Sequence, residues 1–417
     1  MSNNLLNKEQ YEKTKNKIKL NVIQASKTHQ KIKVFIKNIL KSIPKRFVRA
    51  FIILVLSFLF VTVFLNREKF SPDYVGVFLG DMFMQMQSGE GYPYNINGNK
   101  VNNGNFKSIN KDIFVLSDTS FVCLNKSAKE MNNKRHRYQN PILKVSDNRS
   151  IIYDVGGKYV EINSKSKTLH TAMLDNNIIS AAISSHGIYS AVTESNGFLG
   201  QLTVYSKDGD NVYYKYNFAD HYITDVAISE NGRSTAVCGC TAQNGSMVSA
   251  IYVFDYKNEK PKVKLEYHDN MMIQIEYLSN GNIVAVGDKL ISVINPRNGT
   301  SKDYNYENKT LISFDINKND GILLALSLSE DGNNTDIVLI NKSGKVESAF
   351  ETKNNIKSVN FKYRKIAALS YGNLYIYNLS GNKLKTIEVG NETRKVNLFS
   401  SRGAYILGAT KIKKIRF

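Results

Sequence analysis

The fold is decided by the stretch Ile223–Gly245, ITDVAISENGRSTAVCGCTAQNG, and by two later stretches with the same plan. These are Met272–Gly287, MIQIEYLSNGNIVAVG, and Ile356–Gly372, IKSVNFKYRKIAALSYG. Each begins with an apolar strand, turns at a short polar segment, and continues with a second strand that carries Ala followed by a small or aliphatic residue. A repeated unit of this kind is typical of a β-propeller built from tandem blades.

The polar turn between the first and second strands recurs along the chain. Its clearest copies read Ser184-Ser185-His186-Gly187, Ser229-Glu230-Asn231-Gly232, Ser279-Asn280-Gly281 and Ser400-Ser401-Arg402-Gly403. Third strands are aromatic and β-branched, and they run into turns in which Gly supplies a positive φ. The fourth strands are more polar, as suits the wet outer edge of a blade. Each unit therefore predicts one four-stranded antiparallel blade.

The spacing of the units predicts the number of blades. First strands are expected to begin near Phe106, Ile142, Ser180, Thr224, Ile273, Leu311, Lys357 and Lys395. This spacing of roughly 35–50 residues is in the propeller range and predicts an all-β propeller of about eight four-stranded blades, with seven as the alternative. The last blade has only three strands before Phe417, so a strand near 92–96 is expected to close the ring, because an open ring leaves an unpaired edge.

One segment before the repeats has the composition of a membrane span. Residues 50–65, AFIILVLSFLFVTVFL, contain no charged residue, and only Ser57 and Thr62 are polar. With the apolar residues just before it, the run approaches the length of roughly 20 residues that crosses a bilayer. The chain before it is too long for the first region of a signal peptide, and no small-x-small cleavage pattern follows. We therefore expect an uncleaved transmembrane signal anchor.

Basic residues are concentrated before this segment. Residues 1–49 hold 13 Lys and Arg against 2 Glu, whereas the whole chain has a net charge of +20. By the positive-inside rule, residues 1–49 are expected in the cytoplasm and residues 66–417 outside the cell membrane. Apolar residues at helical spacing in 32–43, with lysines between them, predict a basic amphipathic helix on anionic lipid headgroups. A solvated tail is the alternative, and nucleic-acid binding is not expected.

The segment between anchor and ring contains a predicted helix. Ser71-Pro72 is a typical helix start, and Tyr74–Gln87 has a Met- and Phe-rich face that is expected to pack on the propeller or to rest at the bilayer surface. The predicted organisation is a basic cytoplasmic arm (1–49), a transmembrane anchor (50–65), a juxtamembrane helix and linker (66–91) and a β-propeller (92–417).

The repeated unit resembles those of WD-repeat and pyrroloquinoline-quinone-type propellers over residues 92–417. The Gly-His and Trp-Asp dipeptides of WD repeats are missing, and the chain has no Trp, which the docking signature of quinoprotein blades requires. The whole layout looks like an uncharacterised family of single-pass bacterial membrane proteins with an extracytoplasmic propeller. That resemblance implies a fold and a location but no activity.

The sequence contains no recognisable catalytic or cofactor-binding motif. A nucleophile elbow, a phosphate loop and a zinc-protease helix are all absent. The carboxylates Asp154, Asp225 and Asp315 are scattered rather than paired. Cys123, Cys238 and Cys240 have no partner set at zinc spacing, so we interpret them as small buried apolar residues. No catalytic residue, metal site or cofactor is therefore predicted.

Two histidines occupy equivalent places just before a predicted first strand, each beside an aspartate. The pairs are Asp220-His221 and His268-Asp269. Loops at this position line one face of a propeller, so these four residues are candidate ligand contacts there. The alternative is that they only hydrogen-bond neighbouring turns.

Together these observations predict a membrane-anchored, extracytoplasmic propeller that acts as a scaffold for a protein or a cell-envelope polymer. Two alternatives stay open. One is a hydrolase or lyase with its active site on the propeller axis, since catalytic residues in propellers come from separate blades. The other is a one-pass ligand sensor, although the arm is too small to house an output domain. An enzyme is not the favoured interpretation.

Overall fold

The structure, a computed structural model, describes residues 45–65, 72–207, 209, 211–328 and 334–417. The predicted amphipathic helix in residues 32–43 lies outside the described residues, together with the rest of the arm up to residue 44. The chain divides into one unit that ends at Gly76 and a second that runs from Val77 to Phe417.

Two helices precede the strands. Helix α2 (Lys45–Leu65) continues without a break through the apolar run of residues 50–65. Between Phe51 and Val61, nine of its large apolar side chains are exposed, by 40% to 72%. Of the helices in the described part of the chain, none meets the length and hydropathy expected of a membrane span. Helix α3 (Pro72–Met86) begins at a proline, whose fixed φ suits the first helical position.

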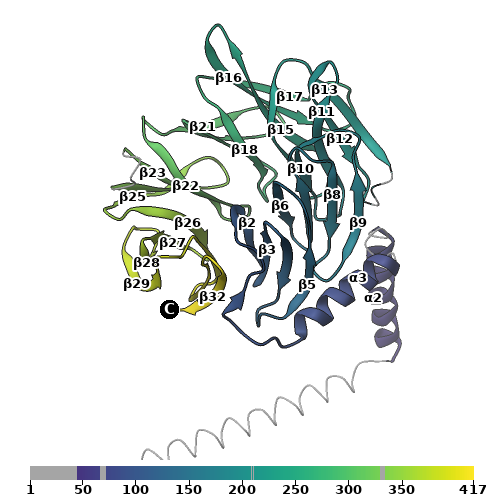
Figure 1. Ribbon diagram of the computed structural model, residues 1–417. Helices are drawn as coiled ribbons and strands as arrows, with labels where there is room; N and C mark the ends of the chain where they lie inside the picture. The colour runs from purple at the N-terminus through teal and green to yellow at the C-terminus, as the bar shows by residue number, and fades with distance from the viewer. Residues whose placement is uncertain (1–44, 66–71, 208, 210, 329–333) are drawn as a thin grey trace, which may run out of the picture. The chain divides into compact units, whose positions relative to one another are not determined.

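The described residues of the second unit form eight four-stranded antiparallel sheets, which follow one another as the blades of a propeller (Figure 1). Blades 1 to 4 are β2 (Val101–Ile109), β3 (Asp112–Ser117), β4 (Ser120–Leu124), β5 (Glu130–Arg135); β6 (Pro141–Ser146), β7 (Arg149–Asp154), β8 (Tyr159–Asn163), β9 (Thr168–Met173); β10 (Ile178–Ile183), β11 (Tyr189–Ser195), β12 (Phe198–Tyr205), β13 (Val212–Phe218); β14 (Tyr222–Ile228), β15 (Thr235–Gln243), β16 (Ser246–Phe254), β17 (Val263–His268).

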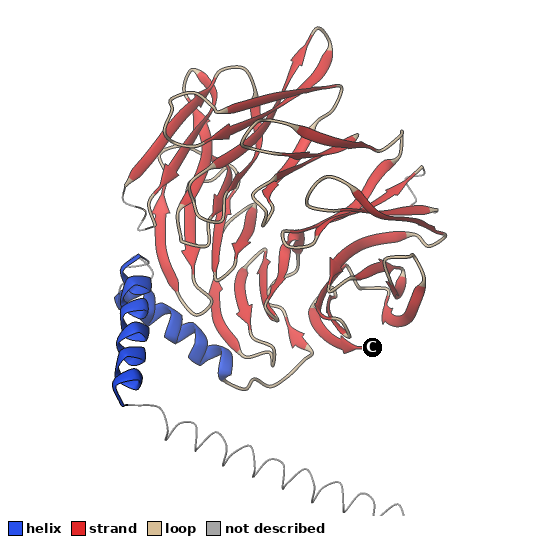
Figure 2. Cartoon of the chain, turned by 180° about the vertical axis from the view of Figure 1, so that it is seen from behind, coloured by secondary structure: helices blue, strands red, loops and turns tan. Residues whose placement is uncertain are grey.

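Blades 5 to 8 are β18 (Met272–Tyr277), β19 (Ile283–Gly287), β20 (Leu290–Ile294), β21 (Ser301–Asn305); β22 (Thr310–Asn317), β23 (Gly321–Ser327), β24 (Thr335–Ile340), β25 (Val346–Thr352); β26 (Ile356–Lys362), β27 (Lys365–Ser370), β28 (Gly372–Tyr377), β29 (Lys383–Gly390); β30 (Lys395–Ser400), β31 (Gly403–Leu407), β32 (Lys411–Arg416) and β1 (Tyr94–Asn95). Apart from the two helices, the described chain is strands and their connections (Figure 2). The predicted propeller of eight four-stranded blades is confirmed, and the seven-bladed alternative is excluded.

The last blade takes its outer strand from the beginning of the ring. Strand β1 pairs antiparallel with β32, with Tyr94 opposite Ile412 and Asn95 opposite Lys411. The segment that the sequence analysis placed near 92–96 is this strand. Its pairing joins the two ends of the propeller, so that blade 8 has the same four strands as the others.

The second strands form the apolar centre of each blade. Every residue of β3, β7, β19, β23 and β31 is buried. Adjacent blades then pack face to face, as where Val192 and Leu202 of blade 3 meet Val226 and Tyr252 of blade 4. The small residues that follow the polar turn, such as Ala285, are wholly buried and allow this close approach.

The antiparallel order of the strands gives the ring two different faces. One face carries the turns between first and second strands and between third and fourth strands, and we call it the turn face. The other carries the turns between second and third strands and the connections from each blade to the next, and we call it the connection face.

Candidate functional site

The four predicted ligand contacts all lie on or next to the connection face, but they do not converge on one point. His221 is wholly buried, with its Nδ1 2.7 Å from the hydroxyl of Tyr252, and burial lowers its pKa. Asp220 is exposed, and its carboxylate is 3.7 Å from Nζ of Lys264. His268 ends β17, and both His268 and Asp269 are exposed in the connection to blade 5. Their role in binding stays a prediction.

Within the described residues, no three side chains of His, Cys, Asp or Glu are grouped so that they could hold a metal ion. Cys123 and Cys238 are buried as predicted, whereas Cys240 is only partly buried, because it lies near the outer end of β15; all three cysteines are free. Burial raises the pKa of the Cys238 thiol, which suits a buried apolar role.

A polar network that sequence reasoning missed joins four blades at their first strands. Oδ1 of Asp225 accepts hydrogen bonds from Nζ of Lys144 at 2.5 Å and from Oγ of Ser180 at 2.8 Å. Its Oδ2 accepts from the backbone N of Ile275 at 3.1 Å. One carboxylate of blade 4 thus holds blades 2, 3 and 5. Burial alone would lower the pKa of Lys144, but the charge and hydrogen bond of Asp225, together with Tyr153 and Glu276, outweigh burial, and the pKa is raised.

Other first strands use the same device to hold the next blade. Oδ1 of Asn105 accepts from the backbone N of Leu143 at 2.9 Å, and Oδ2 of Asp315 accepts from that of Phe361 at 3.0 Å. Nδ2 of Asn397 donates to the carbonyl of Phe106 at 3.1 Å, across the junction between the last and first blades. These polar side chains are therefore engaged in bonds between blades, which is a structural role.

A lysine at the junction between blades 8 and 1 is held in an unfavourable place for its charge. Nζ of Lys395, at the start of β30, donates to the carbonyl of Asn103 at 2.5 Å. Burial and the neighbouring ammonium of Lys107 lower the pKa of Lys395 to about 8, although Asp315 opposes part of the shift. Below that pH the folded ring must keep an unfavourably placed ammonium.

Replacing Lys395 with Met is expected to stabilise the full chain near pH 7 by about 1–3 kcal/mol. Between about pH 8 and about pH 10.5 the folded state loses the Lys395 proton before the unfolded state does, so the stability of the wild type rises through this window. The advantage of Lys395→Met should therefore shrink towards pH 10.5. Urea unfolding of the detergent-solubilised chain near pH 7 and near pH 10 measures it.

Lys395→Arg is the matched control, because Arg stays charged throughout this range. The free energy of unfolding of Lys395→Arg should be close to that of the wild type near pH 7 and lower than that of the wild type near pH 10. If Lys395→Met raised the free energy of unfolding by the same amount near pH 7 and near pH 10, the lowered pKa of Lys395 would be contradicted.

Helix α3 is bound tightly to the turn face at blades 1 and 2. Oδ1 of Asp81 accepts from the backbone N and the hydroxyl of Ser166 at 2.9 and 2.5 Å. Nζ of Lys165 is 2.8 Å from Asp112, both side chains are 4% exposed, and Gln85 donates to the same carboxylate. Both views show α3 beside the ends of these two blades (Figures 1 and 2).

The end of α3 is fixed as well. Nδ2 of Asn125 lies 2.7–3.3 Å from the carbonyls of Met84 and Gln85 in the last turn of the helix and of Gln87 just after it. A helix end leaves its last carbonyls without intrahelical partners. The short turn of blade 1 therefore caps the helix. Sequence reasoning could place the helix, but these contacts with the ring carried no signal in the sequence.

Charge is distributed unevenly between the two faces. Among the described residues between strands, the turn face has 15 basic side chains that are at least partly exposed and 5 acidic ones, whereas the connection face has 7 of each. The basic residues of the turn face are Lys111, Lys126, Lys129, Lys167, Lys207, Arg233, Lys257, Lys260, Lys262, Arg297, Lys318, Lys342, Lys345, Arg364 and Arg402; the acidic ones are Asp147, Glu230, Asp255, Glu259 and Asp320. On the connection face, the basic residues are Lys100, Arg137, Lys158, Lys289, Lys309, Lys353 and Arg394, and the acidic ones are Asp118, Asp175, Asp220, Asp269, Asp288, Glu307 and Glu392.

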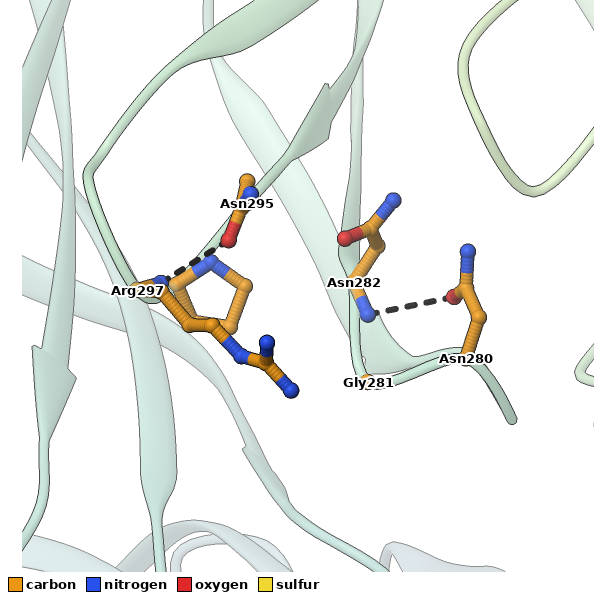
Figure 3. A pocket seen from close by; sticks show the side chains of 6 residues that line it. Asn280, Gly281, Asn282, Asn295 and Arg297 are labelled. Carbon is orange, nitrogen blue, oxygen red and sulfur yellow. Dashed lines mark hydrogen bonds between the residues drawn. The ribbon is translucent and has the colours of Figure 1, made fainter.

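A small pocket lies on the turn face at blade 5 (Figure 3). It is lined by residues 280–282 and 295–297. Oδ1 of Asn280 accepts from the backbone N of Asn282, and Oδ1 of Asn295 accepts from that of Arg297, at 3.1 and 3.0 Å. The amides therefore fix the turns that form the pocket, which favours a structural role for them.

Exposed apolar side chains of the ring gather at its connection face. Of the large apolar residues that are exposed on the described blades, nine lie in or within two residues of the turns and connections of that face, against five at the turn face. The nine are Tyr159, Met173, Phe198, Tyr222, Met247, Met271, Ile273, Leu328 and Tyr371. Tyr, Phe and Met are enriched in protein–protein interfaces, so the connection face is the candidate binding surface.

Comparisons with known proteins agree with the fold. No curated protein matches the chain. A family model described as a family of unknown function (DUF5711) matches residues 90–417. The C-terminal WD40 domain of Sif2 is 12% identical, with a TM-score of 0.55, and the match covers 78% of this chain and 99% of that one.

Two further solved structures are similar to the ring. BamB from Moraxella catarrhalis is 11% identical, with a TM-score of 0.50, over 78% of this chain and 100% of that one. Sqt1 from Saccharomyces cerevisiae is 11% identical, with a TM-score of 0.54, over 79% of this chain and 100% of that one. At these identities the likeness shows the β-propeller fold alone.

Proposed function

Because the chain belongs to this family of unknown function over residues 90–417, we propose a function from its own surfaces. The protein is a membrane-anchored scaffold whose propeller lies outside the cytoplasmic membrane and binds a protein partner through its connection face. The observation that carries the proposal is the gathering of exposed Tyr, Phe and Met side chains on a face whose described residues carry equal numbers of basic and acidic side chains.

The membrane part of the proposal rests on helix α2. Its apolar residues leave no polar face, so a water-exposed helix of this composition would be costly. Lys45, Arg46 and Arg49 lie at its beginning, and the basic residues of 1–44 precede them. The positive-inside rule then assigns the beginning of the chain to the cytoplasm and the propeller to the outside.

Photo-crosslinking in living cells tests the partner. The full chain carries p-benzoyl-phenylalanine in place of either Tyr222 on the connection face, 63% exposed, or Tyr363 on the turn face, 42% exposed. Irradiation is expected to give a discrete protein adduct at position 222 that is missing at position 363. If no protein adduct formed at position 222, or at a second connection-face position such as Phe198, the proposal that this face binds a protein would be contradicted.

The same cells test the location. Protease added to intact, wall-stripped cells should degrade the adduct, because the ring lies outside. An adduct that survives until the cells are lysed would reverse the proposed orientation.

A further inference from the structure

Helix α3 presents an apolar strip on the side that faces away from the ring. Phe78, Leu79, Met82, Phe83 and Met86 recur at helical spacing and are 42% to 77% exposed. Among the residues on the opposite side of the helix, Val77 and Asp81 are only 8% and 7% exposed. The ring therefore covers the side of the helix that carries Asp81, and the apolar side is left exposed.

The bonds to the ring keep the strip pointing outwards. Asp81 is held by the turn of blade 2, Gln85 by Asp112 of blade 1, and the helix end by Asn125. Rotation of α3 about its axis to bury the strip would break these contacts and leave the buried pair of Lys165 and Asp112 without Gln85. The exposure of the strip is thus a fixed feature of the ring.

The turns of blades 1 and 2 on the face that holds α3 are rich in lysine. The turns of blades 1 and 2 on this face carry four basic side chains that are at least partly exposed, Lys111, Lys126, Lys129 and Lys167. The same turns carry one acidic side chain of this exposure, Asp147. The described residues of the turn face as a whole show the same excess of Lys and Arg. Anionic lipid headgroups attract basic side chains near a membrane surface, and apolar helix faces bury themselves at the boundary between headgroups and acyl chains.

The chain also limits how far α3 can be from the membrane. Only residues 66–71 separate Leu65 at the end of α2 from Pro72 at the start of α3. Even fully extended, this connection spans about 25 Å at most. If α2 crosses the bilayer, α3 begins within that distance of its surface.

From the fixed strip, the basic turn face and the short connection, we propose that α3 lies in the interfacial layer of an anionic lipid bilayer. The inference rests on the membrane anchor of the proposed function. In this arrangement the turn face lies against the headgroups, and the connection face, with its candidate binding surface, is directed away from the membrane.

Single tryptophans test this placement, because the natural chain has no Trp. Three full-chain variants each report how close one position is to the acyl chains. Phe83→Trp lies in the strip, Leu56→Trp in the anchor and Phe198→Trp on the connection face. Each is reconstituted in vesicles of phosphatidylglycerol with and without brominated acyl chains. Bromine should quench Trp at positions 83 and 56 at least about twofold more than at position 198.

The outcomes separate the two proposals. Quenching at 56 but not at 83 would overturn the placement of α3 while the anchor stands, and a second copy or a protein partner would then cover the strip. No quenching at 56 would refute the anchor itself. In neutral phosphatidylcholine vesicles quenching at 83 should fall while that at 56 persists. Equal quenching at 83 in both lipids would overturn the role of the basic turn face.

Discussion

Replacing Asp225 with Ala is expected to lower the free energy of unfolding by about 3–5 kcal/mol. The carboxylate is the shared acceptor of Lys144, Ser180 and the backbone of Ile275, which belong to three other blades. The side chain of Asp225 is only 10% exposed and that of Lys144 23%. Without the carboxylate, the ammonium of Lys144 stays at the first strands with no opposite charge bonded to it, and leaving a buried charge uncompensated is the costly step.

Asp336→Ala is the control for this variant. Its carboxylate is 2.6 Å from Nζ of Lys309, nearly the same distance, but the pair is 26–28% exposed and joins only two residues. We expect Asp336→Ala to lower the free energy of unfolding by less than about 1 kcal/mol. Urea unfolding of the solubilised full chain measures both variants.

A second variant tests the cause. Lys144→Met in the Asp225→Ala background should recover a large part of the loss, because it removes the unpaired charge. Equal costs for Asp225→Ala and Asp336→Ala, or no recovery in the double variant, would show that the network does not hold the blades together.

The blades were predictable because their signal is local. A buried second strand such as β19 reads as a short apolar run, and the turn before β15 contains Gly232, whose φ of 70° explains why glycine stands there. Counting the repeats was then enough to see that blade 8 lacks a strand. Local propensity and the fold agree in these elements, so a single sequence suffices.

The bonds between blades were not predictable for the opposite reason. Lys144 and Asp225 are 81 residues apart in the sequence, and only the closed ring brings them together. Asp225 and Asp315 therefore looked like scattered carboxylates. The basic turn face was hidden in a similar way, because turns of the two faces alternate along the chain and no single stretch of the propeller shows the excess charge.

Replacing Tyr405 with Ala is expected to lower the free energy of unfolding by about 3–5 kcal/mol, because it opens a cavity where the ring closes. Tyr405 in β31 is wholly buried, and its ring centroid is 5.3 Å from that of Tyr92 and 4.5 Å from that of Phe399. Its hydroxyl donates to the carbonyl of Lys111 in blade 1 at 2.8 Å. The side chain thus touches the last blade, the first blade and the segment that leads into β1.

The pairing of β1 with β32 is the shortest between neighbouring strands of the described blades, since β1 contributes only two paired residues. Side-chain packing must then supply what backbone pairing does not. Tyr405→Phe, which removes only the hydroxyl, should lower the free energy of unfolding by about 1 kcal/mol. Tyr371→Ala changes a side chain that is 57% exposed and whose ring is contacted by Nζ of Lys357, so it should cost at most about 1 kcal/mol. Unfolding in urea ranks the three variants. If Tyr405→Ala were as mild as Tyr371→Ala, packing around Tyr405 would not close the ring, and the pairing of β1 with β32 would have to hold it alone.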